Sequence, residues 1–167
     1  MSGGLGQDHG PPFFLSPQEH KLVEALVETM IPPGENLVHE PGGREVGAPN
    51  YFDSRMLDLP EPARQAFRLA LKLVDDRSSE SYAKTFAVLS MDERSEILRS
   101  LLTDPTTMSL VFALRAICLE GFYSDYHDPS YLGRTAWDVL EFKGKRIDGV
   151  KKDWSFLRIY RASDGGG

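Results

Sequence analysis

The feature that most constrains the fold is a segment in the second half of the chain that is apolar on nearly every side. Between Met108 and Leu119, only Ser109 and Arg115 are polar. A helix that is apolar all round, in a chain without a membrane span, belongs at the centre of a bundle of other helices. We therefore expect this segment to form a central helix, with Asp104-Pro105 capping its start.

Two capping boxes mark the beginnings of further helices. In Ser16–Glu19 and in Ser90–Glu93, a serine is followed three residues later by a glutamate, so each side chain can bond to the other residue's backbone N–H. The first box opens a helix that ends at Ile31, before two prolines. The second opens a helix that carries apolar residues at helical spacing: Ile97, Leu98, Leu101 and Leu102.

Helical spacing predicts three more elements. A short helix is expected from Pro49 to Leu57, a longer one over Ala63 to Val74, and another short one from Tyr82 to Leu89. No alternating β-branched run is long enough to require a sheet. The predicted fold class is all-α: a single-domain, irregular helical bundle of about five to seven helices with a long C-terminal arm.

The length and local composition divide the chain into three parts. The 167 residues suffice for one domain. Residues 1–12 are rich in glycine and proline and are expected to be flexible. Residues 13–149 form the helical domain, and residues 150–167 form a C-terminal arm with a disordered glycine tail.

Charge and cysteine content exclude several classes of protein. The formal charge of −6 argues against non-specific nucleic-acid binding, which requires clustered Lys and Arg. The single cysteine, Cys118, excludes an internal disulfide and lies in an apolar run, where a buried thiol is expected. No run approaches the ~20 apolar residues of a membrane span. The first residues lack the features of a secretion signal, so we expect a cytoplasmic protein.

No motif in the sequence supports a catalytic or cofactor site. Gly42, Gly43 and Gly47 lack the strand and spacing of a dinucleotide loop, and they predict a turn. His20 and His39 have no nucleophile near them in sequence. We expect no catalytic residue, no bound cofactor and no metal in this chain.

Two local patterns leave an alternative open. Asp125, His127 and Asp128, with Glu120 nearby, could hold a metal, although Asp128-Pro129 is typical of a turn. Arg115 interrupts the central apolar helix, and a buried cation must be paired. An ion pair or a helix-cap contact within the chain is favoured over an active site in a partner.

Aromatic residues late in the chain are the candidate interface. Large aromatics beyond the last capped helix must either fold back onto the bundle or enter a neighbouring protein. The arm from Val150 to Arg161 mixes such residues with basic ones, and the sequence does not decide between these two uses. The predicted interface residues are Phe122, Tyr123, Tyr131, Trp137, Phe142, Trp154, Phe156 and Tyr160.

Several motifs, taken in order, resemble the gluconate 2-dehydrogenase subunit 3 family over roughly residues 14–144. They are Phe14-Leu-Ser-Pro-Gln-Glu19, Leu26-Val-Glu-Thr-Met-Ile-Pro32, Pro41-Gly-Gly-Arg-Glu-Val-Gly-Ala-Pro49 with Phe52-Asp53, Leu89-Ser-x-x-x-Arg94, Glu120-Gly-Phe-Tyr-Ser-Asp125, Tyr131-x-Gly133, Trp137 and Phe142-x-Gly144. The chain departs from the family pattern at Tyr131-Leu-Gly-Arg134, where a Tyr-Gly-Gly-Asn-like turn is usual, and at Phe142-Lys-Gly144, where Phe-Pro-Gly is usual.

The resemblance implies a noncatalytic small subunit. Its partner would be a large FAD-dependent dehydrogenase of the glucose-methanol-choline type, which oxidises a sugar or glycoside hydroxyl and carries both the flavin and the catalytic histidine. Members often carry a twin-arginine export signal, and its absence here implies a cytoplasmic branch of the family. A free-standing helical adaptor and a small metal-dependent hydrolase are the alternatives.

Overall fold

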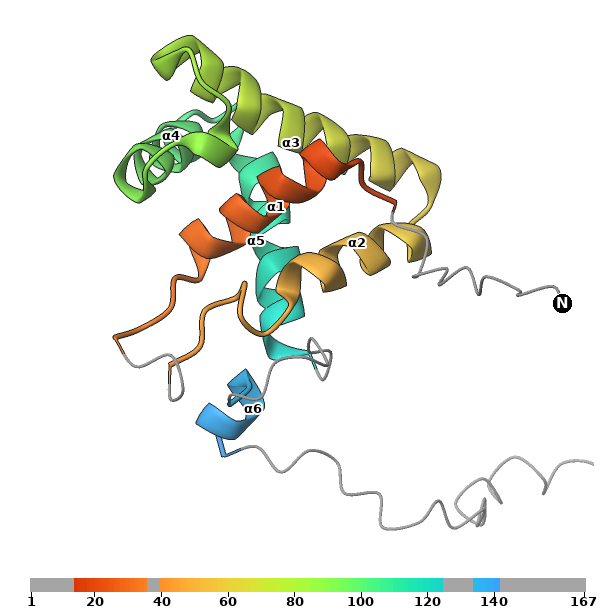
Figure 1. Ribbon diagram of the computed structural model, residues 1–167. Coiled ribbons are helices and arrows are strands. Elements are labelled where there is room, and N and C mark those ends of the chain that lie inside the picture. The colour runs from red at the N-terminus through yellow and green to blue at the C-terminus, as the bar shows by residue number, and fades with distance from the viewer. Residues whose placement is uncertain (1–13, 36–39, 125–133, 142–167) are drawn as a thin grey trace, which may run out of the picture.

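The described part of the chain is helical. The computed structural model describes residues 14–35, 40–124 and 134–141, and within these ranges there are helices and no strands (Figure 1). The α-helices are α1 (Pro17–Met30), α2 (Ala48–Asp58), α3 (Glu61–Tyr82), α4 (Met91–Thr103), α5 (Met108–Tyr123) and α6 (Ala136–Val139), and a 3-10 turn, η1, spans Phe86–Val88. The predicted all-α, irregular bundle is confirmed.

Helix α5 is in contact with every other α-helix of the described chain. It packs against α1, α2, α3, α4 and α6. In Figure 1, α1 and α2 cross in front of α5, α3 and α4 lie toward its first half, and α6 lies beyond its C-terminal end. The side chains that are completely enclosed between these helices include Leu26, Phe52, Val74, Phe86, Leu101 and Leu114.

Both predicted capping boxes are present. The Ser16 hydroxyl accepts a hydrogen bond from the Glu19 N–H at 3.2 Å, and the Glu19 carboxylate accepts one from the Ser16 N–H at 2.8 Å. Ser90 and Glu93 repeat this arrangement at the start of α4, at 3.3 and 2.7 Å. These local signals fix where α1 and α4 begin.

The third helix is longer than the sequence predicted. Its buried positions end at Ser78, whose hydroxyl donates to the Val74 carbonyl at 2.8 Å, and the helix continues to Tyr82. Ala83 then adopts a left-handed conformation, with φ of 52°, and ends it. The predicted short helix from Tyr82 to Leu89 is therefore wrong, because its first residue belongs to α3 and only the 3-10 turn η1 follows.

The predicted cap at the start of α5 is also wrong. The N-cap residue is Thr107, and its side chain makes no capping hydrogen bond. The Asp104 carboxylate instead accepts hydrogen bonds from the Thr106 N–H at 2.9 Å and the Thr106 hydroxyl at 2.7 Å. Asp104 thus stabilises the turn between α4 and α5 rather than the first turn of α5.

Candidate partner interface

A buried carboxylate fastens the segment before α1 to α2. Asp53, on α2, is 4% exposed, and its oxygens accept the N–H groups of Leu15 at 2.7 Å and Phe14 at 3.2 Å. The Arg68 guanidinium lies 4.3 Å from the centre of the Phe14 ring. The motif residues Phe14 and Asp53 therefore serve one structural contact.

A second motif residue, Arg94, ties α4 to the rest of the bundle. Its guanidinium pairs with the Glu28 carboxylate of α1 at 2.7 Å and donates to the carbonyls of Ala87 at 2.8 Å and Phe86 at 3.3 Å. Because all these partners belong to this chain, Arg94 positions α4 and the turn before it. It is not available to a ligand.

The residues Glu120 and Gly121 hold α5 against α2. The Arg55 side chain of α2 lies 3.7 Å from the Glu120 carboxylate. Burial, followed by the hydrogen bond and charge of Glu120, raises the pKa of Tyr51 to about 12. Gly121 is buried, and a Cβ there would lie 2.9 Å from the Tyr51 ring and 3.2 Å from the Ala48 Cβ. The glycine permits this close approach of the two helices.

The glycines before α2 form the predicted turn. A Cβ on Gly43 would lie 2.6 Å from a methyl of Val27, and one on Gly42 would lie 2.7 Å from the backbone nitrogen of Pro33. Gly47 has a φ of 85° and is the N-cap residue of α2. These positions are needed to bring the chain tightly back from α1 to α2.

The described residues contain no arrangement of the candidate metal ligands into a metal site. Asp125, His127, Asp128 and His39 lie outside the described residues, and within the described ranges no cluster of three potential metal ligands occurs. The His20 Nε2 lies 3.2 Å from the Asn50 side-chain oxygen. Cys118 is buried as predicted, and burial raises the pKa of its thiol to about 12, so the thiol is unreactive at neutral pH.

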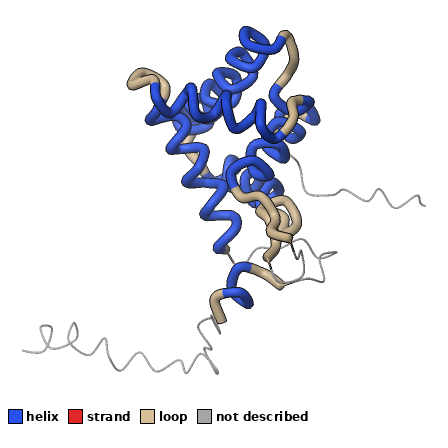
Figure 2. The backbone as a smooth tube through the Cα atoms, turned by 90° about the vertical axis from the view of Figure 1, so that its left-hand side faces the viewer, coloured by secondary structure: helices blue, strands red, loops and turns tan. Residues whose placement is uncertain are grey.

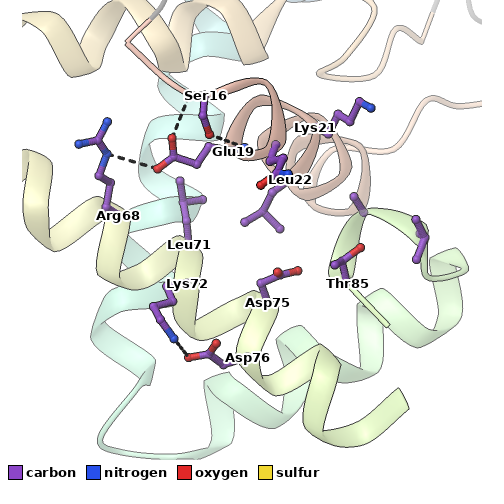
Figure 3. Close-up of a pocket in the computed structure, with 13 residues that line it drawn as sticks. Ser16, Glu19, Lys21, Leu22, Arg68, Leu71, Lys72, Asp75, Asp76 and Thr85 are labelled. Carbon is purple, nitrogen blue, oxygen red and sulfur yellow. Dashed lines mark hydrogen bonds and ion pairs between the residues drawn. The ribbon is translucent and has the colours of Figure 1, made fainter. Parts of the chain in front are cut away.

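A charged groove lies between α1, α3 and η1. It has a volume of about 640 Å³, and Figure 3 shows Leu22 and Leu71 between the charged residues. Two of its cations are neutralised locally, because Arg68 pairs with Glu19 at 3.3 Å and Lys72 pairs with Asp76 at 2.5 Å. The Asp75 carboxylate accepts the Phe86 N–H at 2.8 Å. The groove therefore presents few uncommitted polar groups.

In contrast to the charged groove, one side of α5 is apolar and exposed. Met108 is 40% exposed, Phe112 48% and Tyr123 49%. Ala116 is also exposed, and Leu119 is half-buried. These residues recur at helical spacing over a length of ~22 Å. Together with Arg115, they are called here the outer face of α5: Met108, Phe112, Arg115, Ala116, Leu119 and Tyr123.

The outer face exists because the helices around α5 do not enclose it. Figure 2 shows α5, the helix that descends toward α6, at the edge of the bundle with the other helices on one side. The prediction that α5 packs centrally is confirmed for Val111, Leu114, Ile117 and Cys118, which are buried. It is wrong for the outer face.

Helix α6 extends this surface beyond the end of α5. The Trp137 indole N–H donates to the Tyr123 carbonyl, and Thr135 caps α6 through the Asp138 N–H. Val139 is 42% exposed and Leu140 61%. The outer face and α6 thus place aromatic and aliphatic side chains next to one another.

The predicted interface residues are distributed unevenly. Phe122 is half-buried and meets the exposed Tyr123 edge-on, with 5.0 Å between ring centres. Trp137 is also half-buried. Tyr131, Phe142, Trp154, Phe156 and Tyr160 lie outside the described residues. Met108 and Phe112 are not among the predicted interface residues, although their four-residue spacing on an all-apolar helix was a usable signal.

Arg115 differs from its sequence prediction. The expectation of an ion pair within the chain rested on burial, and Arg115 is exposed. Among the described residues it has no ion pair and no hydrogen bond. It is a charged side chain within an otherwise apolar helix face.

Comparison with known proteins identifies the family of this chain. A family profile described as "Gluconate 2-dehydrogenase subunit 3" matches residues 17–144. The chain belongs to this family. No curated protein and no solved structure matches it. Family membership places the chain among the subunits of dehydrogenase complexes, and in the described ranges no helix has the length and apolarity of a membrane span.

Several motif residues of the subunit 3 family make contacts within the fold. Asp53, Arg94, Glu120 and Gly121 all make contacts that join one helix of the bundle to another segment of it. Their chemistry is used within the fold. None of these contacts uses the exposed apolar residues of the outer face of α5.

Proposed function

We propose that the protein is a noncatalytic small subunit that binds a large FAD-dependent dehydrogenase of the glucose-methanol-choline type. In this proposal the large subunit carries the flavin and the catalytic histidine, and it oxidises a sugar or glycoside hydroxyl. The outer face of α5, continued by α6, is the surface that meets it.

The observation that carries the proposal is the exposed apolar face of a helix in a member of a subunit family. Exposed apolar side chains that are contiguous along ~22 Å are costly in water and are typical of a surface covered by another protein. The surroundings also suit an interface, because Glu120 and Arg55 give the apolar residues a polar border.

The identity of the partner rests on the resemblance to the family. The family description supports a dehydrogenase complex, and the flavin, the sugar substrate and the cytoplasmic location stay predictions. The proposal is consistent with the internal use of the family motif residues, since the side chains of Asp53, Arg94 and Glu120 fasten segments of this chain to one another.

The test is co-expression with a candidate large subunit, an FAD-dependent dehydrogenase of the glucose-methanol-choline type from the same organism. We expect the two chains to co-elute in size exclusion with flavin absorbance, and the small chain purified alone to be colourless and without dehydrogenase activity. Stoichiometric flavin on the isolated small chain would contradict the proposal.

The same preparation separates the two alternatives. Failure to co-elute with any flavoprotein would favour a free-standing adaptor. A stoichiometric metal with hydrolytic activity in the isolated chain would favour the hydrolase.

A further inference from the structure

The position of Arg115 on α5 places a cation inside the candidate interface. On a helix, residues three, four and seven positions apart share one side. Arg115 is therefore a neighbour of Phe112, Leu119 and Met108, all of which belong to the outer face of α5. The next residue toward the end of the helix on this side is Phe122, which is half-buried.

The described part of the subunit offers the Arg115 guanidinium no charge partner. The side chain is exposed, and it forms no ion pair with the described residues, in contrast to Arg44, Arg55, Arg64, Arg68, Arg77 and Arg94. Water solvates the guanidinium in the free protein. Once another protein covers the surrounding apolar residues, that water is lost and the charge requires a new partner.

We propose that the large subunit presents a side-chain carboxylate to Arg115 at the centre of its contact with the outer face of α5. The inference rests on the proposed function and adds the chemistry of the partner surface: apolar, with one Asp or Glu. A carboxylate matches the planar guanidinium by accepting two parallel hydrogen bonds. Such a pair selects the correct partner, because an apolar surface without the carboxylate would leave Arg115 buried and unpaired.

The first test measures the affinity of the intact complex for charge variants. Arg115→Glu is expected to raise the Kd by about 30-fold or more, because it places two carboxylates together in a desolvated contact. The matched control is Arg99→Glu, which reverses an exposed arginine without an ion pair among the described residues on another helix, α4. The control should bind as wild type.

The second test identifies the acceptor. In the Arg115→Lys variant, a carbodiimide should join the new amine to a carboxylate of the large subunit as an amide, which mass spectrometry of the linked peptides locates. The control is Leu69→Lys, which puts an amine on the exposed side of α3. We expect a cross-link to an Asp or Glu of the large subunit from position 115 and none from position 69.

The outcomes separate this inference from the proposed function. If wild type forms no complex with the flavoprotein, the proposed function is wrong. If wild type binds and Arg115→Glu binds equally well, only the carboxylate contact is wrong. A cross-link from position 115 to this chain or to a second copy of it, or a lower melting temperature of the free Arg115→Glu subunit, would likewise overturn the contact.

Discussion

The two sides of α5 differ in how their side chains are packed and paired. On the side toward α2, Gly121 and Glu120 make close contacts with Tyr51 and Arg55, and polar groups are matched with one another. On the outer face, Phe112 and Tyr123 are about half exposed, and Arg115 has no ion pair among the described residues. The comparison teaches that the recognisable motif residues here maintain the fold, whereas the residues available for binding are ordinary apolar side chains.

The comparison is sharpest for two phenylalanines. Phe52, on α2, is fully buried, and Phe112, on the outer face of α5, is 48% exposed. Phe52→Ala should lower the free energy of unfolding by ~3–5 kcal/mol, because it removes core contacts and leaves a cavity. Phe112→Ala should lower it by less than ~1 kcal/mol. Urea unfolding of both variants measures the difference, and equal losses would show that Phe112 is a core residue.

A smaller effect is expected at the contact between Asp53 and the segment before α1. Asp53→Ala removes the acceptor of two N–H groups, those of Leu15 and Phe14, and leaves them without a partner near the core. We expect a loss of ~2–3 kcal/mol in the free energy of unfolding, since hydrogen bonds to charged groups are among the stronger ones. Binding of the large subunit by the folded variant should be unchanged. A variant that keeps its stability would mean that the segment is fastened elsewhere.

The capping serine of α4 should matter less. Ser90→Ala removes the side-chain acceptor of the Glu93 N–H and is expected to cost ~1 kcal/mol of unfolding free energy. The corresponding change at Ser95, which follows the cap within the same helix, provides a control for serine loss. If the two variants melt at the same temperature, the capping box contributes nothing.

Ionisation of Tyr51, in the contact between α2 and α5, should lower the stability of the fold only at alkaline pH. Because the folded pKa of Tyr51 is raised from 10.0 to about 12, the folded state holds this proton more tightly than the unfolded state does. The stabilisation is complete below pH 10 and is lost as pH rises from 10 through 12. Absorbance titration of tyrosinate should show one transition near 12 that Tyr51→Phe removes. In Glu120→Gln that transition should move toward 10, and a transition that stays near 12 would rule out Glu120 as a cause.

Much of the fold could be predicted because its signals are local. The serine–glutamate pairs at Ser16 and Ser90 fix the starts of α1 and α4 through contacts three residues apart. The end of α3 could not be predicted, because residues after Val74 are largely polar and are supported by ion pairs such as Arg77 with Glu80 at 3.7 Å. Helix α6 was missed because its capping box, Thr135 with Asp138, contains aspartate in place of glutamate or glutamine.

The candidate interface was only partly predictable for a different reason. The sequence shows that α5 is apolar all round, but the number of helices available to cover it is a property of the assembled bundle. The apolar pattern predicts burial for Phe112 and Met108, and it leaves the aromatic residues that follow as the predicted interface. The placement of Tyr123 on the same side as Phe112 joins the two regions into one surface.

The most direct test of the central claim is the affinity of two matched variants for the large flavoprotein subunit. Phe112→Asp places a charge on the outer face of α5, and Leu69→Asp places one on α3, where the replaced side chain is 59% exposed. The account predicts that both subunits fold, that Leu69→Asp binds as wild type, and that Phe112→Asp loses ~2 kcal/mol or more of binding free energy. Equal affinity of the two variants would contradict the assignment of the outer face of α5 as the partner interface.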